Sequence, residues 1–409
     1  MAVGKVSTVA NPEHPPFTMK ILFVSNYFPP FYFGGYELKC KQISSLLAGR
    51  GHEIFILTGN YQVAENPNLP EEDNVSRILR YDHPEDSAWM RHKISKWNYR
   101  TTQEIIQKFQ PDIIYLWNQR DLTLGPSYAA CNSGLPKMYQ VGDFWQNTYL
   151  KPGRKAALQR KVSSILPFTL KGNLELHPAI VVGGWMAREM KDKFDAEEVH
   201  HIPRGVIIPA EPDYEKQLHP TPKFLFTGRI DPEKGLHVAI KAFALLHQRK
   251  QIEDFVFNIV GGGDEKCIAE CRQLAIDSGL GDKIHFLGKS REMAGYYASH
   301  TIFIMPTLMR EAFGIVTIEA MCHGTVPIVS DGYGPREIVQ HAENGLRFET
   351  GNSEKLAESI LQLLQNPDLR YTLAKAGRKT VETKYTLEQE ISRVETLLLK
   401  YGHPHSTAS

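Results

Sequence analysis

Short runs of almost wholly apolar residues recur along the first half of this chain, and segments with helical periodicity separate them. They lie at residues 20–25, 53–58, 76–81, 112–117, 136–141 and 179–182. Such runs are typical of strands that are buried on both faces of a parallel sheet. Because parallel strands need crossover connections, which are usually helices, the alternation predicts a doubly wound α/β sheet.

A second series of the same kind follows. It starts with KFLFTG at residues 223–228, and its later members lie at residues 255–260, 283–287 and 301–305. The intervening residues 210–222 are rich in proline and polar side chains, which indicates a linker. The 409 residues of the chain are enough for two domains that each bury a core.

The pattern therefore predicts two Rossmann-like domains and short flanking segments. We expect a disordered leader at residues 1–19, the first domain at 20–209, the linker at 210–222, the second domain at 223–385, a final helix at 386–401 and a disordered tail at 402–409. The leader lacks the apolar run of a signal peptide, and no stretch approaches the length of a membrane span.

Composition excludes several classes of protein. With 47 Lys plus Arg against 46 Asp plus Glu, the net charge of +1 gives no overall field that would attract nucleic acid. The 5 cysteines are scattered and odd in number, which indicates a reducing, cytoplasmic compartment. Cys267 and Cys271 lie four residues apart on a predicted helix, but no second pair accompanies them, so we expect buried thiols and no metal site.

The motif with the most chemical content is Glu311 and Glu319 with seven residues between them. A helical rise would separate the two carboxylates by roughly 12 Å, beyond the roughly 5–9.5 Å of a glycosidase pair. Each carboxylate suits a vicinal diol, and the amides of the helix start from Phe313 to Val316 suit a phosphate. Solvated surface carboxylates remain the alternative interpretation.

These residues and several other segments resemble family 4 of the retaining glycosyltransferases. The similar segments are KILFVSNYFPPFYFGGYE, LAGRGHEIFILTG, FTGRIDPEKGLHVAIKAF, FNIVGGGDE, KIHFLG and the stretch from Arg310 to Gly345. The resemblance implies the GT-B fold, in which two Rossmann-like domains face each other across a cleft. It implies acceptor binding by the first domain, nucleotide-sugar binding by the second, and a final helix that crosses back to the first.

The resemblance also implies a set of donor-binding residues. Arg229 and Lys234 can neutralise the leaving diphosphate, and Glu311 can accept sugar hydroxyls. The full expected donor set is Gly34, Gly35, Arg229, Lys234, Gly288, Glu311, Phe313, Gly314, Ile315, Val316 and Glu319. For Gly34 and Gly35, a simple turn before a helix is the alternative. Glu337 matches a family position but equally suits a helix start.

The expected acceptor-binding residues are Tyr36, Asn118, Arg120, Gly142 and Asp143. Many relatives have a histidine where this chain has Gly142, and that histidine contacts the donor sugar. The front-face mechanism of the family requires mostly the backbone carbonyl there, which Gly142 supplies. Asp143 is expected either to orient the acceptor, as a catalytic residue beside Arg229, Lys234 and Glu311, or to begin a helix.

The expected reaction moves a sugar from a nucleotide diphosphate sugar to a carbohydrate, lipid-linked or small-molecule acceptor, with no cofactor and no metal. The Asp-x-Asp metal motif is absent from the chain. A non-catalytic nucleotide-sugar-binding subunit, a sugar-nucleotide epimerase and a phosphorylase remain alternatives. Residues 87–110 and 151–171 are basic and amphipathic, so they either touch the inner membrane face peripherally or simply pack apolar residues on the core.

Overall fold

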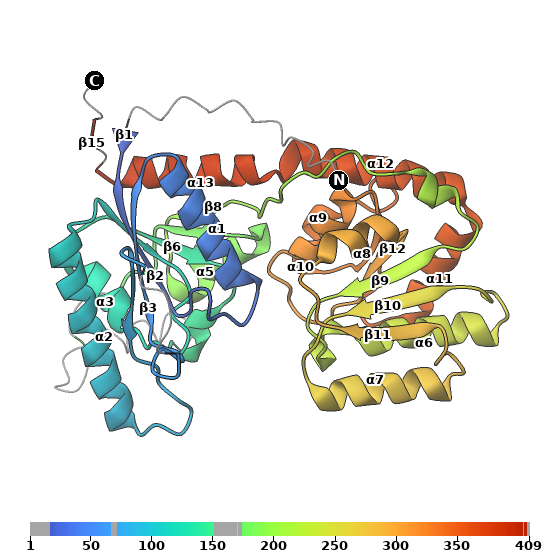
Figure 1. The fold of residues 1–409 in the computed structure, drawn as a ribbon, viewed down its shortest axis with the longest axis horizontal. Helices are drawn as coiled ribbons and strands as arrows, with labels where there is room; N and C mark the ends of the chain where they lie inside the picture. The colour runs from blue at the N-terminus through green and yellow to red at the C-terminus, as the bar shows by residue number, and fades with distance from the viewer. Residues whose placement is uncertain (1–16, 67–71, 151–169, 171–173, 404, 407–409) are drawn as a thin grey trace. The chain divides into compact units, whose positions relative to one another are not determined.

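The structure, a computed structural model, describes residues 17–66, 72–150, 170, 174–403 and 405–406. They form two compact units, whose chain segments are coloured along the sequence in Figure 1. Unit 1 comprises Met1–Val181, Ala187–Ile202 and Ile391–Ser409, and unit 2 comprises Val182–Met186 and Pro203–Glu390.

Unit 1 contains a parallel sheet of seven strands in the order β4-β3-β2-β5-β6-β7-β8. In chain order the strands are β2 (Lys20–Ser25), β3 (Glu53–Gly59), β4 (Val75–Leu79), β5 (Ile113–Leu116), β6 (Lys137–Val141), β7 (Ala179–Val181) and β8 (Val199–His201). All four residues of β5 are buried, which explains its unbroken apolar sequence. The strand order reverses at β2, so the predicted doubly wound topology is confirmed.

Helices cover both faces of this sheet. Helix α1 (Gly35–Gly49) and the end of α13 (Leu387–Tyr401) contribute buried side chains to the same core cluster. Helix α2 (Ala88–Phe109) packs against α3 (Gly125–Asn132). A 3₁₀ turn, η1 (Trp145–Thr148), follows β6, and α5 (Gly184–Phe194) follows β7. Because the strands run parallel, the loops that follow β2, β4, β5 and β6 all start from the same edge of the sheet.

Unit 2 contains a six-stranded parallel sheet in the order β11-β10-β9-β12-β13-β14. Its strands are β9 (Lys223–Thr227), β10 (Val256–Val260), β11 (Ile284–Gly288), β12 (Ile302–Met305), β13 (Val326–Ser330) and β14 (Leu346–Phe348). Its order again reverses beside the first strand, here β9. The second doubly wound sheet is thus confirmed as well.

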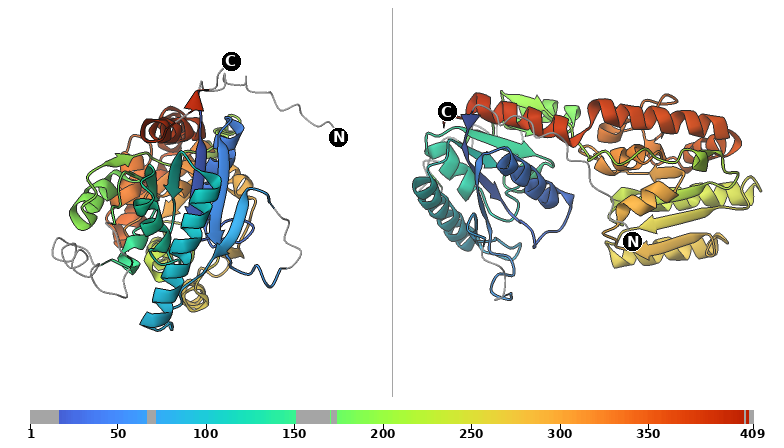
Figure 2. Two further views of the ribbon diagram at one scale, coloured as in Figure 1. Left: turned by 90° about the vertical axis from the view of Figure 1, so that its left-hand side faces the viewer. Right: turned by 45° about the horizontal axis from the view of Figure 1, so that its top comes forward.

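The helices of unit 2 form two groups, which Figures 1 and 2 show on opposite faces of the sheet. One group is α6 (Leu236–Gln248), α7 (Glu265–Asp277) and α11 (Ser353–Gln365). The other is α8 (Met293–Ser299), α9 (Ile315–Cys322), α10 (Tyr333–Ile338) and α12 (Pro367–Lys384). Cys267 and Cys271 of α7 are buried, as expected, because they face the apolar core cluster.

Several details differ from the predicted boundaries. Part of residues 210–222 forms the 3₁₀ turn η2 (Glu215–Leu218), and the Lys216 ammonium donates to the carbonyls of Ala298 and His323, both at 2.9 Å. The stretch expected to be a linker therefore packs on unit 2. At the termini, β1 (Phe17–Thr18) pairs antiparallel with β15 (His405–Ser406), inside segments expected to be disordered.

A buried ion cluster fixes the C-terminal helix to unit 1. The carboxylate of Glu395 accepts hydrogen bonds from the guanidinium of Arg50 and from His52 Nε2, the latter at 2.9 Å. Burial by itself would raise the pKa of Glu395, but the hydrogen bonds from His52 and Arg50 outweigh it and lower the pKa below its ordinary value. The ionised carboxylate consequently stabilises the folded state.

We expect Glu395→Gln to lower the free energy of unfolding by about 1–3 kcal/mol at pH 7, because it removes the charge that Arg50 faces. The folded-state pKa is depressed, so this contribution is present above the ordinary pKa of a glutamate and disappears as the pH falls through the folded value. Urea denaturation of the unsubstituted protein and of Glu395→Gln, from pH 7 to pH 3, measures the difference between their free energies of unfolding. That difference should disappear as the pH falls.

Glu53→Gln is the matched control, because Glu53 is 3.5 Å from Lys20 and both side chains are largely exposed. Its effect should stay below about 1 kcal/mol. Equal effects of the two substitutions at pH 7 would contradict the assignment of Glu395.

Candidate active site

In unit 2, the loop after β9 presents the two predicted cations. Arg229 donates through Nε to the carboxylate of Asp231, and its side chain is 63% exposed. The other oxygen of Asp231 accepts from the Lys234 backbone amide at 3.0 Å, which caps the turn η3 (Pro232–Lys234). One aspartate thus orients both ends of the loop, a role that the sequence analysis did not assign to it.

Lys234 and Glu311 form an ion pair. Lys234 Nζ lies 2.5 Å from Glu311 Oε2, and both side chains are mostly buried. Their two loops are joined by the Leu308 amide, which donates to the Glu233 carbonyl at 2.7 Å. The structure therefore brings together the cation expected at the diphosphate and the carboxylate expected at the sugar. Because each offsets the charge of the other, neither is an isolated buried ion.

Helix α9 begins directly after Gly314, whose φ of +92° is a conformation that favours glycine. The amides of Gly314, Ile315 and Val316 have no hydrogen-bond partner among the described residues, as expected for a helix start. Phe313 is buried against the ring of Tyr385 and so anchors the turn. The predicted site for an anion is thus formed by backbone alone.

Glu319 lies four residues after Ile315, where α9 starts, and so about one turn into the helix. Its Oε2 accepts from the Tyr297 hydroxyl at 2.9 Å. The same hydroxyl lies 3.0 Å from Thr227 Oγ1 at the end of β9. Burial, and then the charge of Glu319, raise the pKa of Tyr297 well above its usual value, so this ring stays a neutral donor.

Tyr297 escaped the sequence analysis because a tyrosine in a short helix carries no motif. Gly288, from the expected donor set, ends β11 with a φ of +74°, and its carbonyl accepts from the Gly261 amide at 2.8 Å. Glu337 accepts from the amides of Gly184 and Trp185 at 2.8 and 2.9 Å. It therefore caps the start of α5, whereas in its own helix, α10, it is the fifth of 6 residues and does not lie in the first turn.

A further group beside Glu311 was not predicted. The Arg310 guanidinium lies 4.7 Å from the ring centroids of both Trp185 and Tyr333. Trp185 Nε1 also donates to the Glu311 carbonyl at 3.2 Å. These contacts fix the backbone on both sides of Glu311.

In unit 1, the Gly34-Gly35 loop leads from β2 into α1. The Gly34 amide donates to Glu37 Oε2 at 3.0 Å, so it is already occupied and does not offer the free donor that we expected. Neither glycine has a positive φ, and an added Cβ would meet nothing closer than 3.9 Å. Gly34 is the N-cap of α1, and Glu37 at the third helical position reaches back to its amide, so the structure favours the interpretation of a turn before a helix.

Gly142 has a packing reason for lacking a side chain. A Cβ on Gly142 would lie 2.0 Å from Cε2 of Tyr36. The Tyr36 hydroxyl donates to the Gln140 carbonyl at 2.6 Å, and its ring contacts that of Trp117 edge to face. Tyr36 thus occupies the space into which a side chain at position 142 would extend.

The other predicted acceptor residues are grouped at the same sheet edge. Arg120 donates to Asp143 Oδ2 at 2.8 Å, and Asp143 Oδ1 accepts from the Trp145 amide at 3.2 Å. Asn118 is buried, and its Oδ1 accepts from the Arg120 amide at 2.9 Å. Asp143 therefore accepts from the first amide of the turn η1, although Phe144 is its N-cap, and it also pairs with a cation.

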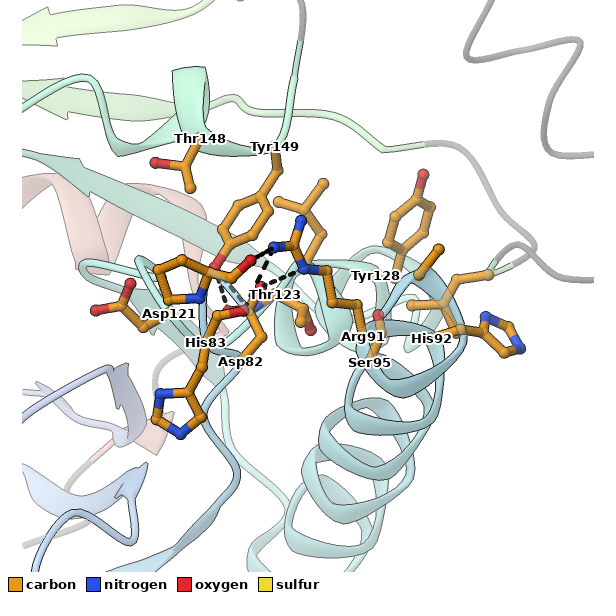
Figure 3. A pocket seen from close by; sticks show the side chains of 14 residues that line it. Asp82, His83, Arg91, His92, Ser95, Asp121, Thr123, Tyr128, Thr148 and Tyr149 are labelled. Atoms are coloured by element: carbon orange, nitrogen blue, oxygen red, sulfur yellow. Dashed lines mark hydrogen bonds and ion pairs between the residues drawn. The ribbon is translucent and has the colours of Figure 1, made fainter. Parts of the chain in front are cut away.

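Unit 1 also contains a cavity of about 530 Å³ that the sequence analysis did not foresee. It lies beyond the ends of β4 and β5 and beside α2. Figure 3 shows Arg91 extending from α2 toward Asp82 and Tyr149, with His92 turned the other way. Among the described residues, the remaining lining is formed by His83, Pro84, Ala88, Ser95, Asp121, Thr123, Leu124, Tyr128, Thr148 and Leu170.

The amphipathic segment at residues 87–110 does not bury all of its apolar side chains. Ile94 is buried, but Trp89 and Trp97 are 59% and 43% exposed. Lys93 Nζ lies 3.5 Å from the Trp89 ring centroid, and the Arg80 guanidinium lies 3.7 Å from that of Trp97. The interpretation in which apolar residues simply face the core is thus wrong for both tryptophans, since cations cover them at the surface.

Of residues 151–171, all but Leu170 lie outside the described part of the chain, so that segment stays a prediction. Within the described residues, no helix is long and apolar enough to cross a membrane. The same residues contain no cluster of three His, Cys, Asp or Glu side chains that could bind a metal ion.

Comparison with known proteins identifies relatives for both halves of the chain. Residues 33–208 match the model of "Glycosyltransferase Family 4", and residues 211–380 match that of "Glycosyl transferases group 1". An uncharacterized glycosyltransferase of Methanocaldococcus jannaschii is 24% identical over 394 residues, covering 90% of this chain and 95% of its own. A phosphatidyl-myo-inositol mannosyltransferase of Mycobacterium leprae is 25% identical over 365 residues, covering 85% and 88%.

Solved structures show the same fold at lower identity. A glycosyltransferase of Rickettsia africae superimposes with a TM-score of 0.72 at 20% identity, covering 93% of this chain and 98% of its own. Anabaena HepE, in a complex with UDP and glucose, gives 0.67 at 19% identity, covering 93% and 100%. With both halves of the chain matched by family models, the protein belongs to family 4 of the retaining glycosyltransferases, the group 1 enzymes with the GT-B fold.

Proposed function

We propose that this enzyme moves a sugar from a nucleotide diphosphate sugar to an acceptor hydroxyl by a metal-independent, front-face reaction. The observation that supports this most is the grouping in unit 2 of Arg229, Lys234 and Glu311 through Asp231, with Lys234 paired to Glu311. The first amides of α9, in the same unit, have no partner among the described residues. Cations, amides and a carboxylate are the groups that a sugar diphosphate requires.

In this mechanism the acceptor oxygen bonds to the anomeric carbon as the bond from that carbon to the diphosphate oxygen breaks. Both events occur on one face of the sugar, so the configuration is retained, and the departing oxygen takes up the acceptor proton. The barrier is the growth of negative charge on the diphosphate. Donors that are already oriented stabilise that charge without reorganising, and Asp231 orients Arg229 and the Lys234 backbone in advance.

Glu311 and Glu319 would bind the two ends of the donor. Glu311 accepts from sugar hydroxyls, while its pair with Lys234 limits the cost of its burial. Glu319, fixed by Tyr297, accepts from the ribose hydroxyls. Relatives include enzymes named as GDP-mannose-dependent and a structure with UDP-glucose, so both kinds of nucleotide deserve testing.

We further infer that the reaction needs no divalent metal, because Arg229 and Lys234 can supply the positive charge. The missing Asp-x-Asp motif agrees with this proposal. All 5 cysteines are free thiols, which fits a cytoplasmic enzyme. The exposed Trp89 and Trp97 with their cations fit peripheral contact with an anionic membrane face.

The first prediction tests the cations. In the presence of EDTA, the purified enzyme should hydrolyse at least one donor from a panel of UDP- and GDP-sugars, or transfer its sugar. Arg229→Ala and Lys234→Ala should each lower turnover on the order of 10²-fold, because each removes stabilisation of the transition-state charge. Product formation from labelled donor measures both statements.

Arg249→Ala is the matched control, since Arg249 lies in the same unit in a half-exposed pair with Glu354 at 2.7 Å. Its turnover should stay within about twofold of the unsubstituted enzyme. Activity that appears only after manganese is added, or near-normal turnover of both active-site variants, would contradict the mechanism.

The second prediction concerns the ribose. Glu319→Ala should weaken nucleoside diphosphate binding about tenfold, because it removes a charged acceptor of hydroxyl protons. The unsubstituted enzyme should also bind 2′-deoxynucleoside diphosphates more weakly than the ribose forms, whereas Glu319→Ala should hardly distinguish them. Calorimetry with UDP, GDP and their deoxy forms measures this. Glu343→Ala, which removes an exposed carboxylate, is the control. If Glu319→Ala distinguished the ribose and deoxyribose forms as well as the unsubstituted enzyme does, ribose binding by Glu319 would be refuted.

The third prediction concerns the departure at Gly142. Gly142→Ala should lower the free energy of unfolding by about 1–3 kcal/mol and impair turnover, because the new methyl group overlaps the Tyr36 ring. The double variant with Tyr36→Ala should be more stable than the sum of the two single effects, since it removes that overlap. Urea denaturation of the four proteins gives the coupling, and strict additivity would show that the two positions are independent.

This packing bears on the alternative of a subunit without catalytic activity. That alternative depended on the histidine missing at position 142. Because Tyr36 fills the space, the glycine is explained by packing and needs no loss of function.

A further inference from the structure

The cavity in unit 1 has an assembled wall of polar side chains. The Tyr149 hydroxyl donates to Asp82 Oδ1 at 3.0 Å and accepts from the Thr123 amide at 3.1 Å. The Asp82 amide in turn donates to the Asp121 carbonyl at 2.7 Å. Loops from the ends of β4, β5 and β6 are thereby joined around one opening, with one oxygen of Asp82 fixed by the tyrosine (Figure 3).

The loop after β5 adopts an uncommon conformation where it lines the cavity. Asp121 and Thr123 have φ values of +66° and +63°, which for residues other than glycine are infrequent and cost energy. Asp121 Oδ2 accepts from the Tyr27 hydroxyl at 3.3 Å, and its other oxygen has no partner among the described residues. The strained backbone thus presents a carboxylate that still has acceptor capacity.

The charges of the described residues that line the cavity do not favour an anion. Among the described lining residues, Arg91 is the sole Lys or Arg, and it is already engaged. Its Nη2 donates to the carbonyls of His83 and Pro84 at 3.3 and 2.9 Å, and its Nε lies 4.0 Å from Asp82 Oδ2. Burial, and then Lys96, lower the pKa of His92, so its imidazole is neutral at pH 7. Asp82 and Asp121 therefore set the sign of the local field.

We propose that this cavity binds the acceptor, and that the acceptor group that enters it is a neutral sugar ring without a phosphate. Its hydroxyls donate to Asp82 and Asp121, while Pro84, Leu124 and Tyr128 contact its less polar faces. Among the described lining residues, a phosphate would meet two carboxylates and an arginine that is already paired, and these charges oppose its binding. The volume of about 530 Å³ lies within the usual range of small-molecule sites.

This inference rests on the proposed function, because an acceptor implies transfer. It goes beyond that function in giving the charge class of the acceptor. A relative named as a phosphatidyl-myo-inositol mannosyltransferase acts on an acceptor that carries a phosphate, so family membership leaves this class open.

Matched pairs of probes test the proposal directly. Methyl glycosides of glucose, galactose and mannose are compared with the 6-phosphates of the same sugars, and binding to the full-length enzyme is measured by saturation-transfer NMR and calorimetry. We expect at least one neutral glycoside to bind, and its 6-phosphate to bind about tenfold more weakly or less. Absence of binding by all three glycosides, or tighter binding of the phosphates, overturns the proposal.

Asp82→Asn and Asp121→Asn should each weaken the bound glycoside about tenfold or more, because an amide replaces an ionised acceptor. Asparagine tolerates the positive φ at position 121, so that variant keeps the loop. Glu104→Gln, an exposed position on α2 outside the cavity, is the control and should bind normally. Undiminished binding by both aspartate variants places the sugar elsewhere and overturns the proposal.

Hydrolysis of the donor without acceptor separates this proposal from the proposed function. Transfer to the bound glycoside should fall in Asp82→Asn and Asp121→Asn by a larger factor than hydrolysis of the donor, while Glu104→Gln should leave both unchanged. If the unsubstituted enzyme hydrolyses no donor, the proposed function fails. The binding measurements then still show whether the cavity binds a neutral sugar. If the aspartate variants lose donor hydrolysis together with glycoside binding, the cavity does not serve the acceptor alone and the assignment is overturned.

Discussion

The carboxyl ends of parallel strands share one edge of a sheet, and each candidate residue in this enzyme is placed by that constraint. Arg229 and Lys234 follow β9, Gly288 ends β11, and Glu311 follows β12. In unit 1, Asn118 follows β5 and Gly142 follows β6. A parallel sheet can therefore assemble a site from loops far apart in sequence, because its buried strands fix the starting point of each loop.

Within unit 2, charge is balanced before any substrate arrives. Asp231 fixes Arg229 and the Lys234 backbone, and Lys234 offsets Glu311. The arrangement avoids isolated buried charges, which would be costly, and still leaves the Arg229 side chain largely exposed toward solvent. Oriented donors of this kind are effective for a reaction whose barrier is the separation of charge.

Unit 1 combines a packing substitution with a polar cavity. Tyr36 of helix α1 fills the space beside Gly142, the position that departs from the family pattern. Asp82, Asp121 and Tyr149 come from three loops and line one cavity. The loops of the unit thus carry the polar side chains that line the cavity, while the strands beneath them are apolar and buried.

The sequence by itself determined the fold class and, in outline, the strands and helices of both sheets, because burial on two faces and helix periodicity leave local patterns. The donor-site residues that its motifs indicate stay a prediction. It missed two contacts between residues far apart in the chain, Tyr297 with Glu319 and Arg80 with Trp97. It also missed three local contacts: Asp231 with Arg229, Glu37 with the Gly34 amide, and Lys93 with Trp89. Only the tertiary structure showed that Tyr36 packs against Gly142, that Lys234 pairs with Glu311 and that the cavity exists. Each of these depends on residues from separate parts of the chain meeting in space, and spacing along one segment contains no information about such meetings.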